Sequence, residues 1–287
     1  MGQSFAPQGF YGGSKTAQEG WSPVHRLLRV LLAEDNKINQ QFATLVLNRA
    51  GHSVEVAANG NLAVNALCSG EFDVVLMDMQ MPDLDGIHAT QKIRALPAPK
   101  GGIPIIALTA CAAPGAREEC LAAGMDDYIS KPFKPSELLW ALDKISDQIL
   151  CPVVEFAAAD KLSEPAAVPD IKELPVLDLE QLDTFESVFS RSKTRTFALL
   201  YMVDVDARLV LIKEYRLMED FEGISRQAHM IVSTAGNLGA KQTSAIARIL
   251  EVSCKETDHV RSDRLIAKLR ASCEQSSREL RSWLRAY

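Results

Sequence analysis

The feature that most constrains the fold is an alternation of short apolar runs and helical segments over residues 29–150. Such alternation predicts parallel strands joined by crossover helices, because two parallel strands need a long connection between them. We therefore expect an α/β domain at residues 27–150, with helices on both faces of a parallel sheet. The expected strands are residues 30–33, 54–57, 74–77, 103–108 and 128–129.

The second half of the chain has a different character. Four prolines punctuate residues 151–176, which predicts a linker. Residues 177–287 contain no proline, and their apolar spacing predicts a helical bundle. The expected helices are residues 178–190, 194–218, 223–236, 238–257 and 260–285. One expected buried stripe steps by four and three residues along the third helix: Ile224, Ala228, Ile231, Ala235 and Leu238.

Composition excludes several classes of protein. The 287 residues carry a formal net charge of −6, which argues against a nucleic-acid partner held by a basic face. No apolar run approaches the roughly 18–20 residues that a membrane helix needs, so we expect no membrane insertion. Residues 1–26 lack the apolar core of a signal peptide and are expected to be a disordered leader. The six cysteines form no C-x-x-C pair, which is typical of reduced thiols in a cytoplasmic protein.

Polar residues follow four of the five expected strands. Glu34 and Asp35 follow the first, Asp78 the third, Thr109 the fourth and Lys131 the fifth. Because parallel strands end at one edge of a sheet, these side chains should meet there. Each alone would be an ordinary loop residue, but together the three carboxylates predict a Mg²⁺ site. An aspartate in such a cluster can attack a phosphoryl group, with Lys131 and Thr109 holding its oxygens.

The sequences around these residues resemble the receiver domain of response regulators and hybrid histidine kinases. The matching motifs are LLAEDNKINQ, VLMDMQMPDLDG, IIALTA and AAGMDDYISKPF, within residues 28–149. The resemblance implies a flavodoxin-like fold with strand order 2-1-3-4-5. It also implies that Asp78 is the phosphoacceptor and that Thr109 and Lys131 contact the phosphoryl group. The implied Mg²⁺ ligands are Glu34, Asp35, Asp78 and the backbone carbonyl of Gln80.

The same resemblance makes further implications for the surroundings of the acceptor. Tyr128 would be an aromatic switch whose rotamer follows Thr109, and the Lys131–Pro132 peptide bond would be cis, a form that proline permits. Gln80 and Cys111, each two positions after a site residue, would tune how water reaches the acyl phosphate. We therefore predict that they set the lifetime of the phosphoryl group.

His229 is the candidate reactive residue of the helical half. The apolar stripe leaves it on the opposite face of its helix with Arg226 and Ser233, so we expect a solvent-facing imidazole open to another protein. A neutral imidazole is a competent nucleophile toward phosphorus, although a lone histidine is more often structural. The stretch AHMIVSTAGNLGA around it resembles the histidine phosphotransfer (Hpt) domain, and the resemblance extends over about residues 177–287. It implies that His229 carries a phosphoryl group.

This helix departs from the family's pattern of leucine, lysine and glycine at the second to fourth positions after the histidine. Ile231, Val232 and Ser233 stand there instead. Val232 removes a positive charge near the phosphoryl group, and Ser233 adds a side chain where glycine permits close docking. We predict that Arg226, one turn before His229, supplies the missing charge, because guanidinium groups pair well with phosphate.

These features predict a two-component phosphorelay protein with Mg²⁺ as its cofactor. Asp78 would accept a phosphoryl group, and His229 would relay phosphoryl groups to or from partner receivers or kinases. The partners would be a sensor histidine kinase and other receiver or phosphotransfer proteins. The chain would not be an enzyme acting on a small-molecule substrate.

Alternatives differ in the role of the helical half. It could be an inactive phosphotransfer domain that only docks partners, as Val232 and Ser233 suggest, or the chain could be the C-terminal fragment of a hybrid kinase. A sensor kinase in its own right is disfavoured, because Met230 follows His229 where a kinase normally has an acidic residue. A phosphatase resembling the haloacid dehalogenase family is excluded, because Gln80 occupies the place of its second aspartate.

Overall fold

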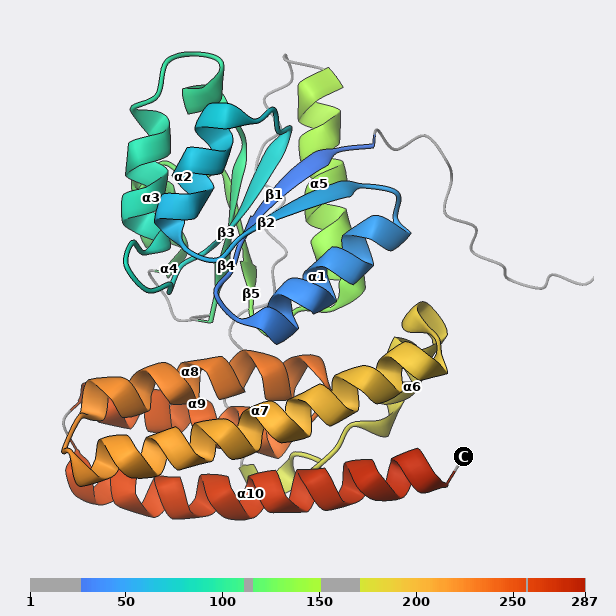
Figure 1. Cartoon of the computed structure of the whole chain (residues 1–287), viewed down its shortest axis with the longest axis vertical. Coiled ribbons are helices and arrows are strands. Elements are labelled where there is room, and N and C mark those ends of the chain that lie inside the picture. The colour runs from blue at the N-terminus through green and yellow to red at the C-terminus, as the bar shows by residue number, and fades with distance from the viewer. Residues whose placement is uncertain (1–26, 111–115, 151–170, 257, 287) are drawn as a thin grey trace, which may run out of the picture.

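The computed structural model describes residues 27–110, 116–150, 171–256 and 258–286. An α/β domain lies above a bundle of helices, and the two are in direct contact (Figure 1). The expected leader, Cys111 and most of the expected linker lie outside the described residues. In the part of the chain that is described, no helix is long and apolar enough to cross a membrane.

The α/β domain is built on a five-stranded parallel sheet with the order β2-β1-β3-β4-β5, as expected. The central strands consist almost wholly of buried apolar residues, because helices cover both faces of the sheet. The strands are β1 (Arg29–Ala33), β2 (Ser53–Ala57), β3 (Val74–Asp78), β4 (Ile105–Thr109) and β5 (Asp127–Ser130).

Four α-helices and one short 3-10 turn connect the strands, and a fifth helix follows the last strand. Two apolar layers result, with α1 and α5 on one face of the sheet and α2, α3 and α4 on the other (Figure 1). The Asn36 side chain caps α1 by accepting from the backbone N–H of Ile38, which fixes the start of the helix next to the acidic strand end. The elements are α1 (Lys37–Arg49), α2 (Gly60–Ser69), α3 (Gly86–Arg94), η1 (Lys100–Gly102), α4 (Ala116–Ala122) and α5 (Pro135–Leu150).

The second half is a helical bundle, as the periodicity predicted. Its central helix is α8, whose predicted apolar stripe from Ile224 to Leu238 is buried at 0–4% exposure. Part of the expected linker is ordered, because Gln242 on α9 bonds the carbonyls of Leu174 and Pro175. The elements are η2 (Ile171–Glu173), α6 (Leu179–Phe189), α7 (Arg191–Leu217), α8 (Phe221–Asn237), α9 (Lys241–Lys255) and α10 (His259–Arg285).

The two domains share one apolar cluster. Phe42 of α1 stacks on Phe185 of α6 with ring centroids 5.6 Å apart, and Phe189 meets Phe42 at 5.9 Å. Phe133, which follows β5, adds a fourth ring 5.7 Å from Phe42. This aromatic contact holds the edge of the sheet where the strands end against α8 and α6 (Figure 1).

Candidate functional site

Three carboxylates meet where β1 and β3 end. One oxygen each of Glu34, Asp35 and Asp78 lies within 4.8 Å of the others. Glu34 and Asp78 are buried at 1% exposure, and the buried Oδ1 of Asp35 has no hydrogen-bond partner among the described residues. A buried, unpaired carboxylate oxygen beside two more carboxylates is the donor set that Mg²⁺ prefers, so these residues can hold the ion.

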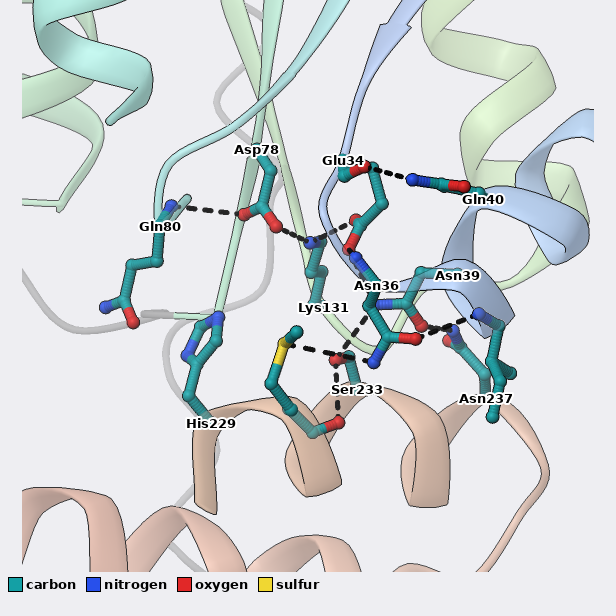
Figure 2. Close-up of polar contacts among 12 residues, drawn as sticks. Glu34, Asn36, Asn39, Gln40, Asp78, Gln80, Lys131, His229, Ser233 and Asn237 are labelled. Carbon is teal, nitrogen blue, oxygen red and sulfur yellow. Dashed lines mark hydrogen bonds and ion pairs between the residues drawn. The ribbon is translucent and has the colours of Figure 1, made fainter. Parts of the chain in front are cut away.

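Lys131 reaches this cluster from the end of β5. Its Nζ lies 2.6 Å from Oε2 of Glu34 and 2.6 Å from Oδ2 of Asp78 (Figure 2). Burial opposes its charge, but Asp78 and Glu34 outweigh burial and raise the pKa of Lys131. The lysine therefore stays protonated, with its ammonium beside the carboxylate of Asp78 where an incoming anion would arrive. The Lys131–Pro132 bond is cis, as the resemblance implied.

Burial and mutual repulsion disfavour the charged forms of Glu34 and Asp35 in spite of Lys131. Burial, and then the nearby charge of Asp78, raise the pKa of Glu34 although Lys131 opposes the shift. Burial and the neighbouring Glu34 raise the pKa of Asp35 to about 6. A divalent cation would oppose both effects, because it favours the charged form of all three carboxylates.

The remaining predicted receiver residues lie around this cluster. Thr109 ends β4 and is buried at 4% exposure, while Tyr128 of β5 is half-buried against the apolar layer of α2, α3 and α4. The backbone N–H of Gln80 donates to Oδ1 of Asp78 over 3.2 Å, which places the Gln80 backbone at the carboxylate. The switch and lifetime roles of these residues stay predictions, and Cys111 lies outside the described residues.

His229 lies directly below this edge of the sheet. Its ring points from α8 toward the receiver side, on the side of Asp78 and Gln80 (Figure 2). The expected solvent-facing imidazole is therefore wrong for this structure: His229 is only 3% exposed, because the α/β domain covers it. Its Nε2 is buried without a hydrogen-bond partner in the ranges that the structure describes, so the nucleophilic atom is available.

A carboxylate that the sequence analysis missed lies behind the imidazole. Oε1 of Glu251 on α9 is 3.3 Å from Nδ1 of His229, as a charge contact, and 2.8 Å from Nζ of Lys255. Burial acts to raise the pKa of Glu251, but His229 and Lys255 outweigh it and lower the pKa to about 2. The negative charge of Glu251 beside Nδ1 favours the proton on that nitrogen and leaves Nε2 free to attack a phosphoryl group. No motif signals this pair, because Glu251 and Lys255 have the spacing of an ordinary helix ion pair.

The cation predicted to support His229 does not reach it here. Arg226 pairs with Glu222 at 2.8 Å and with Asp220 at 3.9 Å, and 55% of its side chain is exposed. Arg248 on α9 instead approaches the α/β domain, where it donates to the carbonyl oxygen of Ala110 and, over 2.7 Å, to that of Lys131. The phosphoryl-supporting role of Arg226 stays a prediction.

A buried polar network joins α1 to α8. Nδ2 of Asn39 donates to Oε1 of Glu34 over 3.0 Å and to Oγ of Ser233 over 3.1 Å, while its Oδ1 accepts from Asn237 over 3.3 Å (Figure 2). The same amide thus contacts a candidate metal ligand and two residues of the helical bundle. Nδ2 of Asn36 approaches the sulfur of Met230 at 3.9 Å in the same region.

Gly236 permits a close approach between the domains. A Cβ atom at this position would lie 2.3 Å from Cγ and 2.6 Å from Cβ of Pro132. The proline that follows Lys131 therefore packs directly on the backbone of α8. The absence of a side chain at Gly236 sets how near α8 can come to the acidic cluster.

Comparison with known protein families gives two matches. Residues 30–143 match the response regulator receiver domain, and residues 199–279 match the Hpt domain. A solved receiver domain of the sensor histidine kinase PA1611 from Pseudomonas aeruginosa PAO1, with a magnesium ion coordinated in its active site cleft, is 43% identical. The alignment covers 42% of this chain and 99% of that one, with a TM-score of 0.40.

Curated relatives align across both halves of the chain. The aerobic respiration control sensor protein ArcB of Escherichia coli K12 is 29% identical over 78% of this chain, and the sensor histidine kinase GacS of Pseudomonas protegens is 30% identical over 81%. The chain spans 28% of the length of ArcB and 25% of the length of GacS. The order of the two matched domains is that of the C-terminal tails of hybrid histidine kinases.

Proposed function

Because this chain is a response-regulator receiver domain followed by an Hpt domain, a phosphorelay module, we propose that Asp78 and His229 are its two phosphorylation sites. Phosphoryl groups would enter at either site and pass between them or to and from partner proteins. The observation that supports this most is the position of His229 on the helix that covers the edge carrying Asp78. Its Nε2 has no hydrogen-bond partner among the described residues.

The first step is attack of a carboxylate oxygen of Asp78 on the phosphorus atom of a donor. A P–O bond to Asp78 forms while the bond from phosphorus to the donor's histidine or leaving oxygen breaks. Glu34, Asp35, Asp78 and the carbonyl of Gln80 would hold Mg²⁺, which would supply Lewis-acid stabilisation of the phosphoryl oxygens. Lys131 contributes a fixed positive charge, and the Thr109 hydroxyl can donate to a phosphoryl oxygen.

The second step exchanges the phosphoryl group between Asp78 and His229. Nε2 of neutral His229 forms a P–N bond, the P–O bond to Asp78 breaks, and the carboxylate of Asp78 leaves. The imidazole keeps its proton on Nδ1 and gains one positive charge, which faces Oε1 of Glu251. The reverse reaction uses the same atoms in the opposite order.

The partners follow from the chemistry of these sites. We propose a sensor histidine kinase as the donor and other receiver or phosphotransfer proteins as further partners, in the cytoplasm. No small-molecule substrate is needed, since the module exchanges phosphoryl groups between proteins. The alignments with ArcB and GacS also favour a place at the end of a hybrid kinase.

Radiolabelled acetyl phosphate with Mg²⁺ tests this proposal on the whole chain. Alkali removes label from an aspartyl phosphate and leaves label on histidine, so the two sites can be read separately. We expect label on both residues of the wild type, on Asp78 alone in His229→Gln, and on neither in Asp78→Ala. Label that never reaches His229 from any phosphorylated donor would instead favour the docking-only role suggested by Val232 and Ser233.

A further inference from the structure

The contacts between the two domains are specific enough to select a partner. We propose that Arg248 holds this Hpt domain against the edge of the sheet that carries Asp78. Ser233, with Asn237, makes the Hpt domain selective for the receiver of its own chain. The inference rests on the proposed function, because it names the receiver with which His229 exchanges its phosphoryl group.

Ser233 determines the selectivity because its receiver partner, Asn39, uses all of its side-chain hydrogen-bonding groups. Asn39 uses one side-chain N–H for Glu34 and the other for Ser233, and its oxygen accepts from Asn237. All three interdomain residues are buried, at 1–6% exposure. A buried polar group that loses its partner destabilises a complex roughly 5- to 150-fold, so a receiver with an apolar side chain at this position would dock poorly. The serine that replaces the family's glycine is therefore a contact with the receiver.

Arg248 supplies attachment of a different kind. Its guanidinium bridges the carbonyl of Ala110, just after β4, and the carbonyl of Lys131, just after β5. Both loops flank the acidic cluster, so these two hydrogen bonds depend on the main-chain geometry of this edge. Hydrogen bonds from a charged donor are about twice as strong as neutral ones, so Arg248 should contribute most of the polar affinity.

Covalent linkage adds to this preference. The receiver ends in α5 and the helical half resumes at η2, with residues 151–170 between them. Covalent attachment of two binding modules gives an effective concentration of roughly millimolar, which free partners rarely reach. While docked, α8 covers Asp78 and the receiver covers His229, so each site is closed to other proteins.

The test measures how fast label moves from Asp78 to His229 in the full chain across about a hundredfold range of protein concentration, all below the effective concentration. Transfer within one chain is independent of concentration, whereas transfer between chains rises in proportion to it. A mixture of Asp78→Ala and His229→Gln chains supplies the between-chain rate directly. We expect a concentration-independent rate in the wild type, at least tenfold above that of the mixture.

Single substitutions assign the effect to residues. Ser233→Ala and Arg248→Ala should each slow the within-chain transfer about fivefold or more, while Ser282→Ala and Arg270→Ala, at exposed positions of α10, leave it unchanged. Small-angle scattering without a phosphoryl donor gives a second readout, because undocking enlarges the radius of gyration whether or not transfer occurs.

The outcomes separate this inference from the proposed function. Transfer that rises in proportion to concentration overturns the inference and leaves the proposed function standing. Unchanged rates and unchanged scattering in both variants overturn the roles of Ser233 and Arg248. Absence of transfer in the wild type contradicts the proposed function, and the scattering of the variants then still decides whether the two residues hold the domains together.

Discussion

Replacing Gly236 by alanine should separate the two domains without weakening either of them. The added Cβ would lie 2.3 Å from Cγ of Pro132, whereas carbon atoms pack at about 3.5–4.0 Å, so Pro132 and α8 must part by about 1.2–1.7 Å. Overpacking of this kind costs about 1–3 kcal/mol, which corresponds to a roughly 5- to 150-fold loss in docking. Within the bundle the added atom comes nearest to Oγ of Ser244, at 3.1 Å.

The helix itself should gain from the same change. Glycine inside a helix is about 0.5–1 kcal/mol less favourable than alanine, so the bundle should melt at an equal or higher temperature. We therefore expect a larger radius of gyration and slower Asp78-to-His229 transfer, together with unchanged helical circular dichroism. Gly102→Ala is the matched control, since its Cβ would meet nothing within 4 Å. An unchanged radius and transfer rate in Gly236→Ala would refute this account of the contact.

Three further outcomes follow from the structure. Glu251→Gln should slow phosphotransfer at His229 less than Glu251→Ala does. The folded pKa of Glu251 is about 2, below its ordinary value of 4.5, so its stabilising effect is present above pH 4.5 and is lost as the pH falls toward 2. Acid titration of Glu251→Gln should therefore show a flatter loss of stability over that range than the wild type shows. Burial raises the pKa of Cys273 to about 12, so iodoacetamide should label exposed Cys68 and spare Cys273 in the native chain, as peptide mass spectrometry would show. At a hundredfold excess over its dissociation constant, Mg²⁺ should raise the free energy of unfolding by about 2.7 kcal/mol, which raises the melting temperature. Asp35→Ala should abolish this rise.

Most of the fold could be predicted from the spacing of apolar residues within single helices and strands. The expected strand at 54–57 is observed at Ser53–Ala57, and the expected helix at 223–236 is observed at Phe221–Asn237. Both follow from spacing within one element, which is visible in a single sequence. The acidic cluster was also predictable, because parallel strands end at one edge and their last residues must meet there.

The environment of His229 could not be predicted in the same way. Its burial depends on a second domain that packs against α8, and each residue that makes this contact has an ordinary local explanation. Asn39 looks like a helix residue, Arg248 like a solvated cation and Gly236 like a weak point in a helix. Only the folded chain brings them together, since their contacts span more than a hundred residues of sequence.

The departures from the family pattern on α8 take on a different meaning in the docked arrangement. Val232, which replaces the family's lysine, is fully buried within the apolar cluster that the two domains share. Positive charge near the candidate phosphoryl path comes from outside α8: Lys131 extends from the receiver, and Lys255 lies behind His229 through Glu251. We therefore expect His229 to rely on cations from outside α8, because Arg226 does not reach it here. The helix then depends on being docked, which is the condition that Ser233 and Arg248 favour.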